Sequence, residues 1–251
     1  MISENPAKRL YDLIATFRTK GSKNPNVASI EVWKAVWNID ENNIFQKIID
    51  LNTLITEIEK KLKCDPQVIN KERHLSWVQP IRNTLNPTAL MAASSNVVAG
   101  SYHPESIHMV TLEFCSEALS KSSGENKISD EEISTLLSDL DALIKDINNQ
   151  IGDQTTRSLL LDLLASVEHG LRAFQIRGPG GIDESLNLAL GKLHRYKAVL
   201  EENSKKEPTG ILKRVVTFLQ GTATVVDNAK KVTDGIALAH NAYEQLSSSL
   251  S

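Results

Sequence analysis

Residues 153–200 contain two apolar repeats separated by a cluster of glycines, and this stretch restricts the possible fold more than any other. Apolar residues recur every three or four positions on both sides of the glycines: Leu160, Leu164, Val167, Leu171 and Phe174 before them, and Leu186, Leu190, Leu193 and Leu200 after them. Each half is therefore predicted to be an amphipathic helix. The intervening Gly178-Pro179-Gly180-Gly181 is expected to interrupt the helix and form the loop. Such a short connection makes the two helices antiparallel neighbours in a hairpin.

The composition is that of an ordinary globular protein with one or two domains. The chain has 251 residues, of which 41% are hydrophobic and 24% charged. Lys and Arg number 28 and Asp and Glu number 31, which leaves a net charge of −3. Because no overall basic field is available to hold a polyanion, we expect no nucleic-acid partner.

Cysteine content and hydropathy favour a cytoplasmic protein. Cys64 and Cys115 have no CxxC context and are too few for a disulfide framework, which is typical of a reducing compartment. The N-terminal residues mix charged and apolar positions, so they do not resemble a secretory signal. The uncharged apolar stretch 215–226 is shorter than the roughly 20 residues that a membrane-spanning helix needs.

Two helices in the first half of the chain carry apolar residues that are expected to face the core. Trp33 and Trp37 lie one helical turn apart in 29–37, where a stacking platform for bases is conceivable. Core packing is the favoured interpretation because no basic groove surrounds them. A later helix is predicted to run from about 102 to 119. We expect its inward face to consist of Ile107, Val110, Phe114 and Ala118.

Charge is distributed unevenly between two segments of the second half. Ser129 and Glu132 form a capping box, which predicts a helix beginning there. Residues 122–153 contain eight acidic and two basic residues, a local charge of −6, whereas 203–231 contain six basic and two acidic residues, a local charge of +4. The two segments are predicted to associate, within one molecule or between copies.

The C-terminal region shows a heptad repeat. Its apolar positions alternate in steps of four and three from Ile211 to Leu246, and Leu212, Leu219, Ala223 and Val226 widen the stripe. This pattern predicts one continuous amphipathic helix. A stripe so wide should not face water, so the helix either folds back onto the bundle or binds another chain. The residues predicted to bind a partner are Ile211, Val215, Phe218, Val225, Val232, Ile236, Tyr243 and Leu246.

These observations predict an all-α protein with three parts. Residues 1–202 are expected to form a multi-helix bundle built on the long antiparallel hairpin, and 203–210 a polar linker. Residues 211–251 are expected to form the long heptad-patterned interaction helix.

Sequence motifs for catalysis or cofactor binding are absent. The chain has no Walker loop, GxGxxG or GxSxG motif, and spacing singles out no acid and base, so we expect no catalytic residue, no cofactor and no metal. His103, Glu105, His108 and Cys115 lie close in sequence, but their spacing does not match a zinc motif.

One anion site remains an alternative. Arg172 and Arg177 flank the glycine turn, where free amides at a helix start favour phosphate. Asp183 is expected to cap those amides and to repel an anion, so a plain hairpin turn is preferred.

Three segments resemble a widespread family of uncharacterised bacterial helical proteins: SIEVWKAVWNID, TLEFCSEAL and FQIRGPGGIDESLNLALGKL. In that family the hairpin carries an aromatic residue, then Ile-Arg-Gly, then Gly and a hydrophobic residue. The positions that fit are Phe174, Ile176, Arg177, Gly178, Gly181 and Ile182, whereas Pro179-Gly180 makes the turn more rigid here. The resemblance covers the chain up to about residue 200 and implies an all-α fold, with no established activity.

The function that the sequence favours is non-enzymatic interaction. We expect an adaptor or accessory subunit of a bacterial multi-protein system, such as antiviral defence, whose partner is a second copy or a neighbouring subunit. A membrane-acting effector that uses the C-terminal helix is the first alternative. An enzyme, or a phosphate or nucleotide binder at the Arg-Gly-Pro-Gly-Gly turn, is the second.

Overall fold

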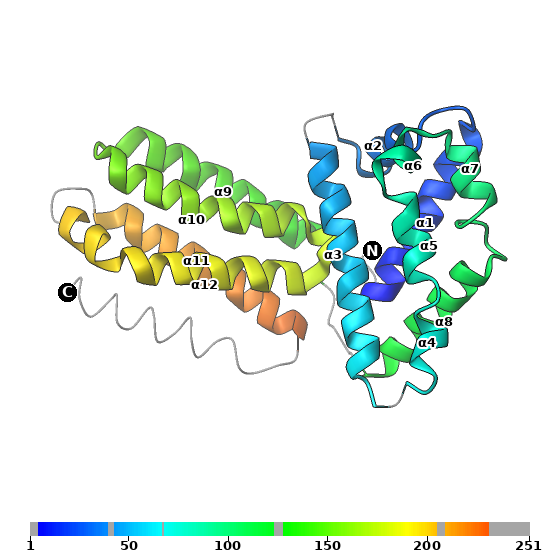
Figure 1. The fold of residues 1–251 in the computed structure, drawn as a ribbon. Helices are drawn as coiled ribbons and strands as arrows, with labels where there is room; N and C mark the ends of the chain where they lie inside the picture. Colours follow the sequence, from blue (N-terminus) through cyan, green and yellow to red (C-terminus); the bar gives the residue numbers. More distant parts are fainter. Residues whose placement is uncertain (1–4, 40–42, 67, 123–127, 205–208, 231–251) are drawn as a thin grey trace. The chain divides into compact units, whose positions relative to one another are not determined.

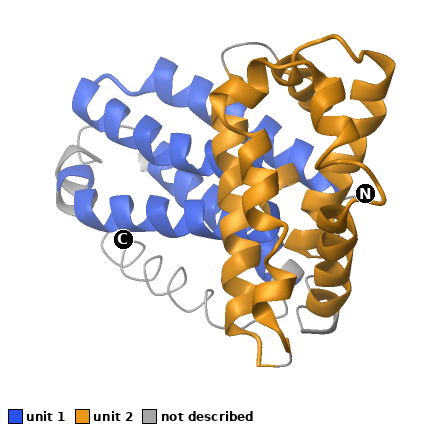
Figure 2. Cartoon of the chain, turned by 45° about the vertical axis from the view of Figure 1, so that its right-hand side comes forward, with its two compact units in different colours: residues 1–2, 125–174, 178–251 blue, residues 3–124, 175–177 orange. Residues whose placement is uncertain are grey.

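The structure is a computed structural model that describes residues 5–39, 43–66, 68–122, 128–204 and 209–230 (Figure 1). Within these ranges every regular element is a helix, apart from one antiparallel bridge between Ala28 and Ala93. The predicted all-α class is therefore confirmed. The chain divides into two compact units (Figure 2): unit 2 comprises 3–124 and 175–177, and unit 1 comprises 1–2, 125–174 and 178–251.

Unit 2 is built around its first helix. Its helices are α1 (Pro6–Lys23), α2 (Ser29–Trp37), α3 (Ile44–Cys64), α4 (Lys71–His74), α5 (Val78–Thr84), α6 (Pro87–Met91), α7 (Ser94–Ala99) and α8 (Ile107–Ser122). Pro6 at the first position and the Asn5 side chain, which accepts from the Lys8 N–H, start α1. The stripe of Leu10, Ile14 and Phe17 is fully buried, and α1 packs against α2, α3, α7 and α8. The core of unit 2 therefore surrounds α1.

An aromatic cluster fills the centre of this core. Trp33 and Trp37 stack with ring centroids 4.7 Å apart, and Phe17 lies 4.7 Å from Trp33. Tyr102 meets Phe17 edge-on at 5.2 Å, and its hydroxyl lies 2.7 Å from Thr84 Oγ1. Both tryptophans are buried, which confirms the interpretation that they pack in the core.

The described part of unit 1 contains four long helices that run side by side (Figure 1): α9 (Asp130–Gln150), α10 (Gln154–Arg172), α11 (Phe174–Ser204) and α12 (Thr209–Lys230). The predicted capping box at Ser129 and Glu132 is present and starts α9. A separate hydrophobic core joins the four helices, with α9 packed against α10 and α12. The sequence predicted one bundle over 1–202, whereas the structure distributes those residues between two cores.

The predicted antiparallel hairpin is formed by α10 and α11. Lys192 Nζ on α11 donates to Asp162 Oδ1 at 2.9 Å and to Ser166 Oγ at 3.0 Å on α10. Closer to the turn, a side chain at Gly170 would lie 2.5 Å from Ser185 Oγ, so the helices touch there. The apolar stripe on α10 is buried throughout, and on α11 Leu190 is half-buried while the other predicted leucines are buried.

The turn itself differs from the prediction. The helical path is broken at Gly178 alone, which has φ 61° and ψ −160°, and 179–181 form the first turn of the following helix. The expectation that Gly178-Pro179-Gly180-Gly181 forms the loop was therefore wrong. Proline is well suited to the first helical position, because its fixed φ is helical and its missing N–H is not needed there.

The short helical turn before Gly178 belongs to unit 2. Ile176 is fully buried in the core of that unit. The buried Arg9 of α1 donates from Nε to the Ile176 carbonyl and from Nη2 to the Arg177 carbonyl, both at 3.3 Å. These contacts give the Ile-Arg-Gly segment a structural role, since Gly178 lets the chain turn immediately after the carbonyls that Arg9 holds.

Candidate interaction surface

The described half of the predicted interaction helix lies inside unit 1. Ile211 and Val215 are buried in the core, while Phe218 and Val225 are half-buried against it. The described part of the predicted stripe therefore follows the first of the two arrangements that the sequence left open: it folds back onto its own helices. The remaining predicted positions, Val232, Ile236, Tyr243 and Leu246, lie outside the described residues.

The acidic and basic segments meet where α12 packs on α9. Arg214 Nη1 lies 2.7 Å from Asp146 Oδ2. This ion pair is of the kind predicted from the charges of −6 and +4. Such a half-exposed pair contributes about 0–1 kcal/mol, so the apolar contacts dominate the packing of α12.

Helix α8 has an exposed apolar face that the sequence assigned to the interior. Its buried residues are Met109, Thr111, Leu112, Cys115, Ser116 and Leu119, and the apolar ones among them belong to the core of unit 2. On the other side, Ile107 is 62% and Phe114 is 56% exposed, and Val110 is half-buried between them. The prediction of an inward face was therefore wrong for Ile107 and Phe114, whereas Ala118 packs against the core as predicted and Val110 is half-buried. We call the row of Ile107, Val110 and Phe114 the α8 surface.

The edge of the α8 surface is acidic. Glu113 and Glu117 are exposed and follow Val110 at three and seven positions, which places both carboxylates on the same side of the helix. Within the described part of the chain, neither side chain forms a hydrogen bond or an ion pair. Unit 2 therefore presents an apolar row next to two carboxylates that are available to a ligand.

Helix α3 exposes a smaller apolar pair. Phe45 is 60% and Ile49 is 57% exposed, one helical turn apart. This pair matches Phe114 and Ile107 of the α8 surface in residue type and exposure, but it spans one turn instead of two. It therefore offers matched control positions for experiments on α8.

The two arginines of the alternative anion site, Arg172 and Arg177, belong to different units. Arg172 is exposed and donates from Nε to Glu168 Oε1 at 2.8 Å, within α10 of unit 1. Arg177 is half-buried in the segment that belongs to unit 2. Asp183 lies four residues after Pro179, in the second helical turn, so it is not the N-cap that the sequence predicted.

Two of the residues considered as metal ligands, His103 and Cys115, have local hydrogen-bond partners. The Glu105 N–H donates to His103 Nδ1 at 3.3 Å, and the Cys115 thiol donates to the His74 carbonyl at 3.2 Å. Burial raises the pKa of Cys115 to about 11, although the Trp77 side chain beside it acts in the opposite direction. Among the described residues, no group of three or more His, Cys, Asp or Glu side chains is arranged to hold a metal ion.

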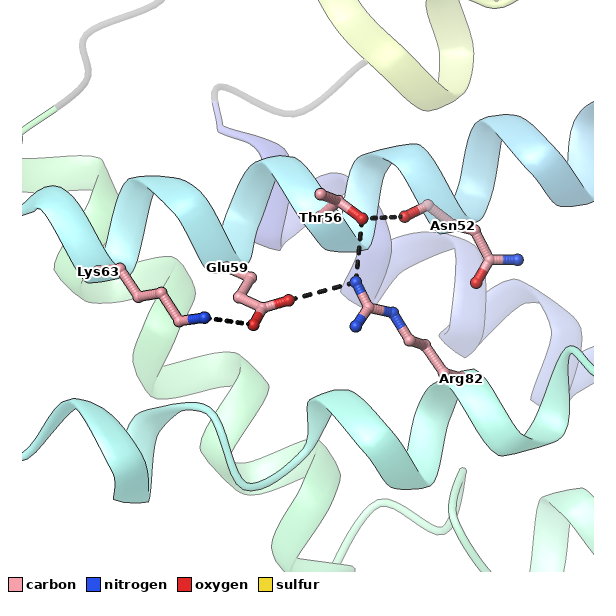
Figure 3. Close-up of polar contacts among 5 residues, drawn as sticks. All are labelled: Asn52, Thr56, Glu59, Lys63 and Arg82. Atoms are coloured by element: carbon pink, nitrogen blue, oxygen red, sulfur yellow. Dashed lines mark hydrogen bonds and ion pairs between the residues drawn. The ribbon is translucent and has the colours of Figure 1, made fainter.

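A polar network joins α3 and α5 of unit 2 (Figure 3). Arg82 Nη2 donates to Thr56 Oγ1 at 2.9 Å and to Glu59 Oε2 at 3.2 Å, while Lys63 Nζ lies 2.6 Å from Glu59 Oε1. The hydrogen bond from Lys63 and the charges of Lys63 and Arg82 lower the pKa of Glu59, outweighing the opposite effect of burial. Glu59 therefore remains ionised and links α3 to α5.

The protonation states of Cys115 and Glu59 determine what chemistry these groups can support. Cys115 is a neutral thiol at pH 7, whereas a cysteine nucleophile needs the thiolate. Glu59 is a carboxylate whose pKa is shifted away from neutrality, whereas efficient general acid–base catalysis needs a pKa near the working pH. Both groups are suited to a structural role.

The chain matches no protein-family model, no curated protein and no solved structure. The resemblance to the bacterial helical family therefore stays a prediction. No helix in the ranges that the structure describes has an apolar stretch long enough to cross a bilayer. The α8 surface is thus the main candidate site that the geometry offers.

Proposed function

We propose that this chain is a non-catalytic helical interaction protein, an adaptor or accessory subunit that binds a partner protein through the α8 surface. The observation that carries the proposal is the exposure of Ile107 and Phe114, 62% and 56%, on a helix whose opposite face is fully packed. Burial against α1 fixes α8 in place, so the apolar row is presented by a rigid element.

The size of the α8 surface suits a helical partner. Positions 107, 110 and 114 have the i, i+3, i+7 spacing through which helices bind grooves or other helices. Covering the exposed parts of Ile107 and Phe114 contributes roughly 1–2 kcal/mol each, since full burial of such a side chain contributes about 1.5–3 kcal/mol. Additional contacts around this centre are needed for stable binding, because association carries a large entropic cost.

The surroundings of α12 favour this proposal over the membrane-acting alternative. Ile211, Val215 and Leu219 are buried in the core of unit 1. For α12 to insert into lipid, these side chains would have to leave that core, which costs the hydrophobic stabilisation of the whole helix. The α8 surface needs no such rearrangement.

Site-specific photo-crosslinking tests the proposal. The full chain, carrying p-benzoylphenylalanine in place of Phe114, is expressed in its native cells and irradiated, and adducts are identified by mass spectrometry. The matched control carries the same residue in place of Phe45, which is similarly exposed on α3. We expect one discrete protein adduct from position 114, none from position 45, and loss of the adduct on Ile107→Asp.

Two results would contradict the proposal. The absence of any adduct from position 114 would remove its basis. The same set of adducts from positions 114 and 45 would mean that the crosslinker reports general surface exposure.

A further inference from the structure

Several acidic residues in the described part of the chain form ion pairs within 3.2 Å: Asp12 with Lys8, Glu31 with Lys34, Glu57 with Lys61, Glu59 with Lys63, Asp162 with Lys192, Glu168 with Arg172 and Asp146 with Arg214. Glu113 and Glu117 have no such partner among the described residues, and both are exposed. The apolar row and the unpaired carboxylates lie side by side on one helix.

From this juxtaposition we propose that the α8 surface recognises a basic amphipathic helix of a partner protein, an inference that rests on the proposed function. The partner's apolar residues cover Ile107, Val110 and Phe114. Lys or Arg side chains that flank the partner's apolar face pair with Glu113 and Glu117. Because charges at the rim of an interface mainly select the partner and accelerate association, the carboxylates supply specificity and the apolar row supplies affinity.

The same charges disfavour other ligands. A phosphate backbone and an anionic membrane surface are both negative, so each meets Glu113 and Glu117 as like charges. An acidic helix meets the same repulsion. The surface therefore selects against these three classes and in favour of a cationic helix.

Two synthetic helical peptides provide the probe. Both are 18-residue designs with leucines at i, i+3, i+7 and i+10, and they differ only in flanking lysines or flanking glutamates. Binding to the full-length protein is measured by fluorescence anisotropy at low and high salt. We expect the lysine peptide to bind at least about threefold more tightly than the glutamate peptide at low salt, and the difference to shrink at high salt.

Protein variants then assign the effect to named residues. Phe114→Asp should abolish binding of the lysine peptide, whereas the matched control Ile49→Asp on α3 should leave it unchanged. The double variant Glu113→Gln with Glu117→Gln should remove the preference between the peptides, and Glu113→Lys with Glu117→Lys should reverse it. Circular dichroism confirms that each variant is folded.

The possible outcomes separate this inference from the proposed function. If both peptides bind equally and Phe114→Asp removes both, the α8 surface is real and the charge selection is wrong. If neither peptide binds, or if Phe114→Asp and Ile49→Asp have the same effect, the interaction surface itself is refuted. A Phe114-dependent dimer without peptide, or Phe114-dependent binding to phosphatidylserine vesicles, would overturn the inference in favour of a second copy or a membrane.

Discussion

Helices α8 and α12 both differ in burial from what their sequences suggested. The stripe of α12 was the predicted binding surface, yet Ile211, Val215 and Leu219 are buried in unit 1. The row on α8 was the predicted inward face, yet Ile107 and Phe114 are exposed. An apolar pattern thus identifies a face that avoids water, but the rest of the chain decides which such face is covered internally.

The reason for the difference lies in how apolar residues surround each helix. In α8 they occupy two faces: Met109, Leu112, Cys115 and Leu119 on one side, and Ile107, Val110 and Phe114 on the other. Either face is compatible with burial by periodicity alone. In α12 a single wide stripe leaves no such choice, and α9 supplies both an apolar surface and acidic residues for it.

Truncating one large side chain on each helix tests the difference in burial between α8 and α12. Leu219→Ala on α12 should lower the free energy of unfolding by about 2–5 kcal/mol, because Leu219 is buried in the core of unit 1. Phe114→Ala on α8 should change it by less than about 1 kcal/mol, because surface substitutions usually have small effects. Urea denaturation of both variants measures the difference. Equal losses would mean that the two faces are equally covered.

Substituting one glycine on a covered helix face and one on an open face tests how closely each face is packed. Gly170→Ala on α10 should destabilise by about 1–3 kcal/mol, because the new methyl group would lie 2.5 Å from Ser185 Oγ and 3.1 Å from the Gly181 carbonyl. Gly221→Ala on α12 meets no atom within 4 Å, so it should stabilise by up to about 1 kcal/mol. Thermal unfolding followed by circular dichroism measures both. A destabilising Gly221→Ala would indicate that another backbone approaches this side of α12.

The smallest effect concerns the charged edges of the two helices. Arg214→Ala should cost about 0.2–1 kcal/mol at low salt and almost nothing at 1 M salt, because the pair with Asp146 is half-exposed and screened. Glu117→Gln on α8 should leave stability unchanged at both salt concentrations, since Glu117 has no ion-pair partner in the described ranges. A clear loss for Glu117→Gln would show that its carboxylate serves folding and is not reserved for a ligand.

Local sequence signals predicted much of the fold. The capping box at Ser129 and Glu132, the antiparallel hairpin and the buried tryptophans follow from short-range rules of helix initiation, periodicity and packing, and the structure confirms all three. The turn was predicted in part, because Gly178 breaks the helix but Pro179 starts the next one.

The candidate site could not be predicted in the same way. The exposure of Phe114 depends on α1, α4 and α5 packing against the opposite face of α8, and these contacts join segments far apart in the chain. Similarly, the burial of Ile176 in unit 2 and its contact with Arg9 have no signal in local periodicity. One signal was available in the sequence: α8 has large apolar residues on two faces, which is more than one core contact requires.

Hydroxyl-radical footprinting of the native full-length protein, read out by mass spectrometry, measures directly whether α8 exposes its apolar row while α12 buries its stripe. We expect Phe114 and Ile107 to be oxidised rapidly in the free protein and protected when the lysine peptide is bound. Val215 and Leu219 should react slowly in both states, because they are buried within unit 1. Rapid oxidation of Val215 and Leu219 together with a protected Phe114 in the free protein would contradict the account.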